Sequence, residues 1–157
     1  MIDVGTSLAI CGGAVVSSLA GIGSAIGIWS TARVAAGVLS EAPEKFGSLL
    51  TLSILPGTQG IYGLVLAFMV LIKLDMLGGA PMELTAEQGL RILLACIPIG
   101  AVECVSAIFQ GRVAANGVPM VAKRSEQVGQ AMTLSVLVEI YALFGLIIGI
   151  FFILFGF

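Results

Sequence analysis

The chain has 157 residues and a formal net charge of −2, and 59% of its residues are apolar even before its 21 glycines are counted. Charged residues make up 10%, against about 25% in a soluble domain, so polar groups cannot cover a globule of this size and a multi-pass membrane protein is predicted. The seven lysines and arginines are scattered along the chain, with only Lys123 and Arg124 adjacent, which excludes nucleic acid as a partner because its recognition needs a basic patch.

Four stretches are long enough to cross ~30 Å of hydrocarbon, which takes about 20 helical residues. No charged residue lies between Asp3 and Arg33 or between Lys45 and Lys73. The run from Arg91 to Arg112 contains only Glu103, and the run after Glu126 contains only Glu139. We therefore expect an all-α membrane protein built from two tandem helical hairpins, residues 1–77 and 86–157. The expected transmembrane helices cover residues 4–38, 46–72, 90–118 and 127–157.

Turn-forming residues connect these helices at 40–45, at 73–88 with Gly78-Gly79-Ala80-Pro81, and at 116–126. All lysines and arginines except Lys73 and Arg91 lie at or near the first and third connections. Because cytoplasmic connections of membrane proteins carry an excess of lysine and arginine, we expect connections 40–45 and 116–126 in the cytoplasm. Both termini are then expected on the opposite side of the cell membrane.

A shift of 82 residues aligns the two hairpins, laying Thr51-Leu52-Ser53 on Thr133-Leu134-Ser135 and Gly63-Leu64 on Gly145-Leu146. The hairpins have the same orientation, so they are parallel repeats that can stack side by side. Glycine, alanine and serine recur along the first helix and more weakly along the third, which favours close helix packing. That pattern fits either an inner layer of a larger assembly or packing within one four-helix chain. The bulkier second and fourth helices are expected to face lipid.

Glu139 is expected deep in the fourth helix, where an ionisable group opposes membrane insertion by about 2.5–3.5 kcal/mol and is a functional candidate. The second helix offers a matching stripe at i, i+3, i+4 and i+7, formed by Leu55, Thr58, Gln59 and Tyr62. Pro56 is expected to bend this helix and loosen backbone carbonyl oxygens near the stripe. Gln110 adds an amide, provided that the third helix extends beyond the membrane.

These oxygens suit Na⁺, a hard cation that takes several oxygen ligands and whose charge one carboxylate neutralises. A proton site needs less, namely a buried carboxyl and one hydrogen-bond partner. The number of oxygens favours Na⁺, with H⁺ as the alternative. A second alternative is a stand-alone four-helix transporter or channel whose polar stripe lines a substrate path.

At these residues the chain resembles the proteolipid, or rotor-ring, subunits of V-type ATPases, most closely the bacterial sodium-translocating form. The resemblance covers essentially the whole chain. Its most specific parts are Pro43-Glu44-Lys45-Phe46-Gly47, Leu55-Pro56-Gly57-Thr58-Gln59-Gly60-Ile61-Tyr62-Gly63, Gln110-Gly111-Arg112-Val113-Ala114-Ala115 and Val138-Glu139-Ile140-Tyr141-Ala142.

The resemblance implies a ring of identical subunits that carries one ion per subunit during rotation coupled to ATP hydrolysis or synthesis. The implied Na⁺ ligands are the Leu55 carbonyl, Thr58, Gln59, Gln110 and Glu139, with Tyr62 hydrogen-bonded to the carboxylate. The implied partners are a stationary membrane subunit with an essential arginine and central-stalk subunits at the cytoplasmic connections. The chain contains no GxxxxGK[ST] loop, so it is expected to be non-catalytic, with nucleotide chemistry in other subunits.

The sequence departs from the sodium-form pattern at two positions. Ile140 stands where a polar residue is expected, and Glu103 is an additional carboxyl. We expect Glu103 to be protonated in the ring interior or hydrogen-bonded to a neighbour. In the 82-residue shift Gly57 takes the place of Glu139, so only one hairpin carries the ion-binding acid.

Overall fold

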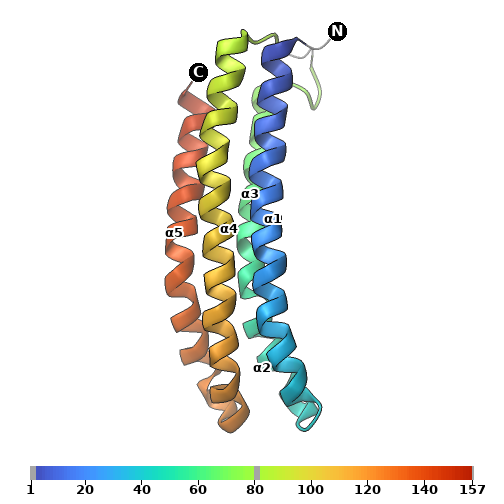
Figure 1. Ribbon diagram of the computed structural model, residues 1–157, viewed down its shortest axis with the longest axis vertical. Helices are drawn as coiled ribbons and strands as arrows, with labels where there is room; N and C mark the ends of the chain where they lie inside the picture. Colours follow the sequence, from blue (N-terminus) through green and yellow to red (C-terminus); the bar gives the residue numbers. More distant parts are fainter. Residues whose placement is uncertain (1–2, 80–81, 157) are drawn as a thin grey trace.

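The computed structural model describes residues 3–79 and 82–156, which form an elongated bundle of long helices (Figure 1). Ala80 and Pro81 of the expected second connection lie outside the described residues, as do residues 1, 2 and 157 of the expected hairpins. The elements are α1 (Val4–Leu39), η1 (Pro43–Lys45), α2 (Phe46–Ile54), η2 (Leu55–Gly57), α3 (Thr58–Lys73), α4 (Ala86–Lys123), η3 (Ser125–Gln127) and α5 (Val128–Phe155).

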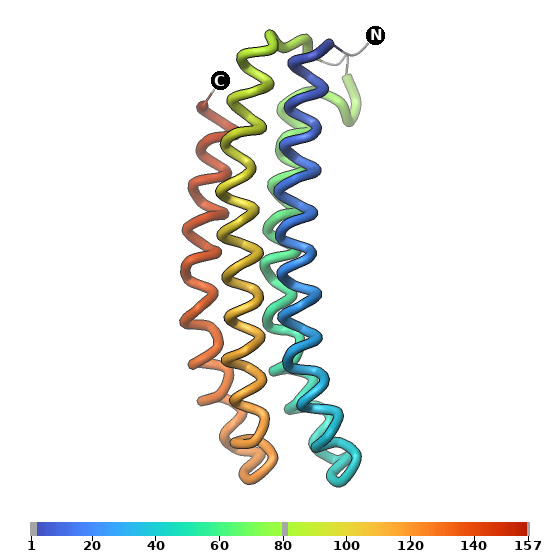
Figure 2. The backbone as a smooth tube through the Cα atoms, in the orientation of Figure 1, coloured from blue at the N-terminus to red at the C-terminus, as the bar shows by residue number. Residues whose placement is uncertain are grey.

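Four helical segments in the described part of the chain are long and apolar enough to cross a membrane, as expected. They run up and down as two hairpins, the first made of α1 with α2 and α3, the second of α4 with α5 (Figure 2). The described chain starts and finishes at the same end of the bundle, and η1 and η3 lie at the other end. The structure places no membrane around the bundle, so the sides of the membrane stay a prediction.

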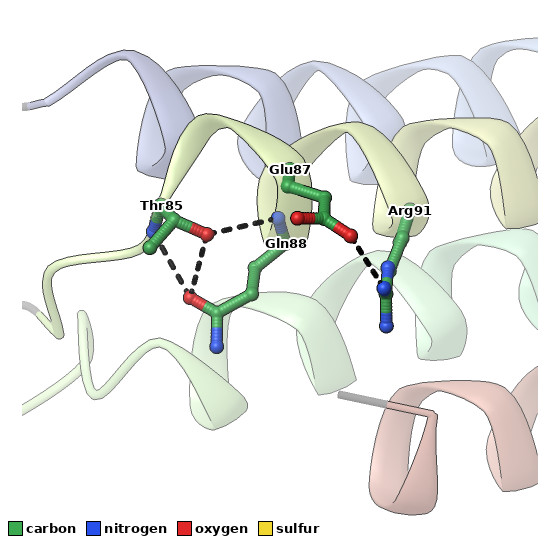
Figure 3. Close-up of polar contacts among 4 residues, drawn as sticks. All are labelled: Thr85, Glu87, Gln88 and Arg91. Atoms are coloured by element: carbon green, nitrogen blue, oxygen red, sulfur yellow. Dashed lines mark hydrogen bonds and ion pairs between the residues drawn. The ribbon is translucent and has the colours of Figure 1, made fainter.

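Side chains cap the starts of both hairpins and fix where the helices begin. The Asp3 carboxylate accepts hydrogen bonds from the Thr6 backbone N–H and the Thr6 hydroxyl, both at 2.7 Å, and these bonds lower the pKa of Asp3. At α4 the Thr85 hydroxyl accepts from the Gln88 N–H at 3.2 Å, while the Gln88 amide oxygen accepts from the Thr85 N–H at 2.9 Å (Figure 3). This reciprocal capping box satisfies N–H groups that the first helical turn leaves unpaired.

The second membrane segment is interrupted at Pro56, as the sequence predicts. Residues Leu55–Gly57 form a 3-10 turn between α2 and α3. Proline has no N–H to bond the carbonyl four residues before it, and its ring crowds that carbonyl. The interruption falls directly before Thr58 and Gln59, so the break shapes the backbone on which the polar stripe is built.

The expected third connection, residues 116–126, is wrong in extent. Helix α4 continues through Asn116 and Pro119 to Lys123, and only Arg124 separates it from η3. A proline removes one helical hydrogen bond without necessarily ending a long helix. In addition, the terminal carbonyls of α4 find a partner outside the helix: the Lys45 ammonium donates to the carbonyl oxygens of Ala122 at 2.8 Å and Val121 at 3.3 Å.

Lys45 therefore joins the end of the first hairpin to the second, and it also bonds the Ser125 hydroxyl at 3.1 Å. We expect Lys45→Met to lower the free energy of unfolding by about 0.3–1 kcal/mol, the usual contribution of a cation at a helix C-terminus. The measurement is thermal unfolding of the detergent-solubilised protein at low salt. Lys123→Met, which changes an exposed lysine of the same region, is the control; an equal effect of both substitutions would contradict a specific role for Lys45.

Helices α1 and α4 pack side by side through small residues, which brings their backbones together (Figure 1). A Cβ atom added at Gly111 would overlap the backbone of Gly27, and one added at Gly27 would overlap the Ala107 carbonyl. The Thr31 hydroxyl donates to the Gly111 carbonyl oxygen at 3.0 Å across the same contact. The small residues thus serve packing within the chain at these positions, while other small residues of α1, such as Ser18 and Gly21, remain exposed.

Helix α3 packs on α1 and helix α5 packs on α4, and together they carry most of the exposed large apolar side chains. On α5 these include Phe144, Ile147, Ile148 and Phe151, each about half exposed in the single chain. Large apolar groups on a surface that no water-soluble domain could tolerate are suited to contact with lipid. The small-residue helices α1 and α4 pack on each other within the chain, while the expectation that the bulky helices face lipid stays a prediction.

Candidate ion-binding site

The site is centred on Glu139, which projects from α5 into the bundle and is only 8% exposed. One carboxylate oxygen, Oε1, accepts a hydrogen bond from the Tyr62 hydroxyl of α3 at 2.7 Å. The other, Oε2, accepts from the Gln110 amide of α4 at 3.1 Å. Three helices that are distant in sequence thus meet at one carboxyl group.

A second amide extends the network away from Glu139. Gln59 is fully buried on α3, and its Nε2 donates to the Gln110 Oε1 at 2.7 Å. Gln110 is also fully buried, and α4 continues far enough past it to place it inside the bundle. The helix extends to Lys123, and the expectation that it reaches beyond the membrane stays a prediction.

Thr58 and the Leu55 carbonyl lie beside the amides at the break in the second span. The Thr58 hydroxyl donates to the Leu55 carbonyl oxygen at 3.0 Å and contacts Gln59 Oε1 at 3.3 Å. The Leu55 carbonyl belongs to the 3-10 turn, where it also accepts a hydrogen bond from the Thr58 backbone N–H. The structure therefore brings together all six side chains or carbonyls that the sequence selected; their role in binding an ion stays a prediction.

Two serines support this network and were not selected from the sequence. Ser106 lies one turn before Gln110, and its hydroxyl contacts Gln59 Nε2 at 3.4 Å and donates to the Val138 carbonyl oxygen at 3.1 Å. The Ser135 hydroxyl donates to the Gln110 carbonyl oxygen at 3.2 Å. Both are one turn, i and i+4, from a selected residue, so a search for polar residues at this spacing would have found them.

Glu103 is a second buried acid near the site. The expected hydrogen bond to a neighbour is not found among the described residues of the chain, and the expected place of Glu103 in the ring interior stays a prediction. Its side chain is fully enclosed by its own chain, beside Gly145 on α5. Within residues 3–79 and 82–156 neither carboxyl oxygen has a hydrogen-bond partner. An unpaired carboxylate in such surroundings would be very costly, which favours the uncharged form of Glu103 and leaves Glu139 as the carboxylate of the site.

The chemistry of the site follows from this count of charges and oxygens. Glu139 supplies one negative charge, and carbonyl, hydroxyl and amide oxygens lie next to it, which is the ligand set of a hard cation. A monovalent cation would make the site neutral, whereas a divalent one would leave a net positive charge in the membrane. The arrangement therefore suits one monovalent cation.

Tyr62 offers a direct test of the network. We expect Tyr62→Phe to weaken cation binding roughly ten-fold, because a hydrogen bond to a charged group contributes about 1.5–3 kcal/mol and 1.4 kcal/mol is ten-fold in affinity. Equilibrium binding of radioactive sodium to the purified protein measures this change. The other tyrosine, Tyr141, is 66% exposed on the outside of α5, so Tyr141→Phe is a matched control. Equal affinities for both variants would contradict the role of Tyr62.

The family model for the C subunit of ATP synthase matches the chain twice, over residues 9–70 and 93–152. The chain belongs to the family of ATP synthase C subunits. Members of this family assemble into oligomeric rings, so the chain is a membrane subunit of a ring, and each of its hairpins corresponds to one match of the family model.

Two relatives cover most of the chain. The V-type sodium ATPase subunit K of Enterococcus hirae is 39% identical over 144 residues, which are 92% of this chain and 88% of the relative. The A-type ATP synthase subunit K of Methanocaldococcus jannaschii is 37% identical over 147 residues, which are 94% of this chain and 59% of the relative. One relative thus belongs to a sodium ATPase and the other to an ATP synthase.

Proposed function

We propose that this chain is the rotor-ring subunit of a V-type ATPase and that each copy binds one Na⁺ at Glu139. The observation that carries the proposal is the meeting of the Glu139 carboxylate with Tyr62 and Gln110 in the bundle interior. The proposed Na⁺ ligands are Glu139, Gln110, Gln59, Thr58 and the Leu55 carbonyl, while Tyr62 orients the carboxylate. The sodium ATPase subunit K of Enterococcus hirae, similar over nearly the whole chain, supports Na⁺ as the ion.

The charge of the site explains how a copy of the chain with bound Na⁺ could rotate within the membrane. With Na⁺ bound the site is neutral, and a neutral site avoids the penalty of about 2.5–3.5 kcal/mol for an ionised side chain facing lipid. Without Na⁺ the carboxylate needs another positive partner. An arginine on a stationary membrane subunit would hold the bare carboxylate while the ion leaves, and the site would reload from the other aqueous side.

The energy for transport comes from other subunits. Moving one Na⁺ against 100 mV takes about 2.3 kcal/mol, and the chain has no phosphate-binding loop. We therefore assign it a non-catalytic role, in which it carries ions and torque while ATP is hydrolysed or formed elsewhere. The central stalk would contact the end of the bundle that holds residues 40–45 and 124–127, which the positive-inside tendency places in the cytoplasm of a cell-membrane protein.

Modification of Glu139 by a hydrophobic carbodiimide tests the proposal, because the reagent attacks protonated carboxyls in lipid. The labelled peptide is identified by mass spectrometry in assembled rings at neutral pH, with and without millimolar NaCl, and KCl serves as the salt control. We expect Na⁺ to protect Glu139 and K⁺ not to. Labelling that ignores Na⁺ would contradict the sodium site and favour H⁺ as the ion carried by the same ring.

A further inference from the structure

A pocket of about 570 Å³ lies between α1 and α4, and every residue that lines it belongs to one of these two helices. Two of the lining residues are arginines, Arg33 of α1 and Arg112 of α4, and both are exposed. None of the six residues of the candidate ion site lines this pocket. It is therefore a separate feature of the bundle, with a chemistry of its own.

The packing of α1 on α4 holds the two arginines at a similar depth in the bundle. Gly111, which directly precedes Arg112, packs on the backbone of Gly27. The Thr31 hydroxyl, two residues before Arg33, donates to the Gly111 carbonyl oxygen at 3.0 Å. Because these close contacts join the two helices directly beside the pocket, they fix the positions from which the two arginines extend.

No carboxylate balances the charge of this pocket. The single ion pair found within residues 3–79 and 82–156 lies in the first turns of α4, at the other end of that helix. The remaining polar side chains of the lining, Ser30 and Asn116, are neutral hydrogen-bonding groups. Arg33 and Arg112 thus give the pocket two positive charges, and the pocket is complementary to an anion.

Each arginine lies over an aromatic ring of its own helix. The Arg33 Cζ is 4.6 Å from the centre of the Trp29 ring, and the Arg112 Cζ is 5.2 Å from the centre of the Phe109 ring. A cation–π contact uses the flat face of the guanidinium and leaves its N–H edge free. That edge forms paired hydrogen bonds with phosphate oxygens. A phosphate group has enough oxygens to bond both arginines at once.

The surroundings favour the phosphate of a lipid over a phosphate in solution. No charged residue lies between Asp3 and Arg33, so Arg33 is the first charge beyond the apolar part of α1, where lipid headgroups are expected. Trp29 is 58% exposed, and tryptophan is enriched at the headgroup level of membranes. Ile22 and Ile26, which precede Trp29 at helical spacing, are also exposed. They offer an apolar surface to an acyl chain.

We propose that Arg33 and Arg112 bind the phosphate of an anionic membrane lipid, with Trp29 beside the headgroup and an acyl chain along α1. Net charge makes the site selective. A zwitterionic lipid has a positive group next to its phosphate, which the two arginines repel, whereas phosphatidylglycerol has none. This end of the bundle is expected in the cytoplasm, and cytoplasmic leaflets contain anionic lipid. The ion site plays no part in this inference, so the two proposals can fail independently.

Lipid binding to purified rings tests the site. Delipidated rings in detergent are titrated with phosphatidylglycerol or phosphatidylcholine, and the lipid molecules retained by each ring are counted by native mass spectrometry. We expect phosphatidylglycerol to bind with at least about ten-fold higher affinity, because each arginine near an anionic headgroup contributes about five-fold. Equal binding of the two lipids by the parent ring would overturn the proposal, and this comparison needs no variant.

Substitutions show whether the preference depends on the two arginines. Arg33→Gln combined with Arg112→Gln should abolish it, and each single substitution should reduce it about five-fold. Arg91→Gln changes an exposed arginine at the other end of α4 (Figure 3) and should leave it unchanged. The intact mass of each ring is measured first, so that only assembled rings are compared.

Two outcomes in these rings would also overturn the site. The first is a preference for phosphatidylglycerol that survives the double substitution or falls equally in Arg91→Gln. The second is displacement of the lipid by inorganic phosphate at an ionic strength matched with NaCl, which would identify a site for a soluble anion instead. Retention of the lipid in excess inorganic phosphate is the expected result.

Discussion

Glu139→Gln is expected to abolish sodium-coupled transport and to weaken Na⁺ binding at least about 100-fold. Glutamine keeps the size of the side chain but removes the negative charge, so a bound Na⁺ would leave an unbalanced charge inside the membrane. A penalty of about 3 kcal/mol for such a charge corresponds to about two factors of ten in affinity. The measurement is sodium uptake by vesicles that contain the assembled complex, together with Na⁺ binding to the isolated ring.

Two matched variants show whether this loss is specific to the charge of Glu139. Glu139→Asp keeps the charge on a shorter stem and should retain weakened binding. Glu103→Gln changes the other buried acid, which has no hydrogen-bond partner in the described residues, and should leave Na⁺ binding unchanged. Normal transport by Glu139→Gln, or equal losses in Glu139→Gln and Glu103→Gln, would contradict the proposed site.

Gly111→Val is expected to prevent stable assembly. Any Cβ at this position would overlap the Gly27 backbone, so α1 and α4 would have to separate. Separation would break the hydrogen bond from Thr31 to the Gly111 carbonyl and displace the neighbouring Gln110. Overpacking usually costs about 1–3 kcal/mol, and we expect the upper end of that range because the obstacle is backbone. Thermal unfolding and the yield of intact ring measure the effect.

Gly129→Ala is the control for the packing of Gly111. Gly129 is exposed in α5, and a Cβ there would meet no atom within 4 Å. Alanine in a helix is favoured over glycine by about 0.8–1 kcal/mol, so this variant should be as stable as the parent or slightly more so. If Gly111→Val assembled as well as Gly129→Ala, the close packing of α1 and α4 would be wrong.

The membrane helices could be predicted from the sequence because charge is so costly in lipid that its absence marks a span. The polar stripe could be predicted for the same reason, since Gln59 and Glu139 have no place in a lipid-facing helix. Helix geometry predicts that these polar residues lie together. A period of 3.6 residues places Leu55, Thr58, Gln59 and Tyr62 on one face of the second helix, and the length of each span predicts the depth of its polar residues.

The extent of α4 could not be predicted in the same way. Pro119 and the basic residues near it are typical of the end of a helix. Helix α4 continues past them because Lys45, 76 residues before Val121, bonds the terminal carbonyls of α4. Glu103 shows a second limit. Its place on α4 was evident, but only the packing of Gly145 against it shows that the carboxyl is enclosed within one chain.

The most direct test of the central claim is the number of sodium ions that the isolated ring holds. Purified ring is equilibrated with radioactive sodium, and bound ion is counted against the number of chains known from the mass of the intact particle. One saturable Na⁺ per chain, lost in Glu139→Gln and kept in Glu103→Gln, is the predicted result. An intact ring that binds no saturable Na⁺, or binds it equally after Glu139→Gln, would contradict the account.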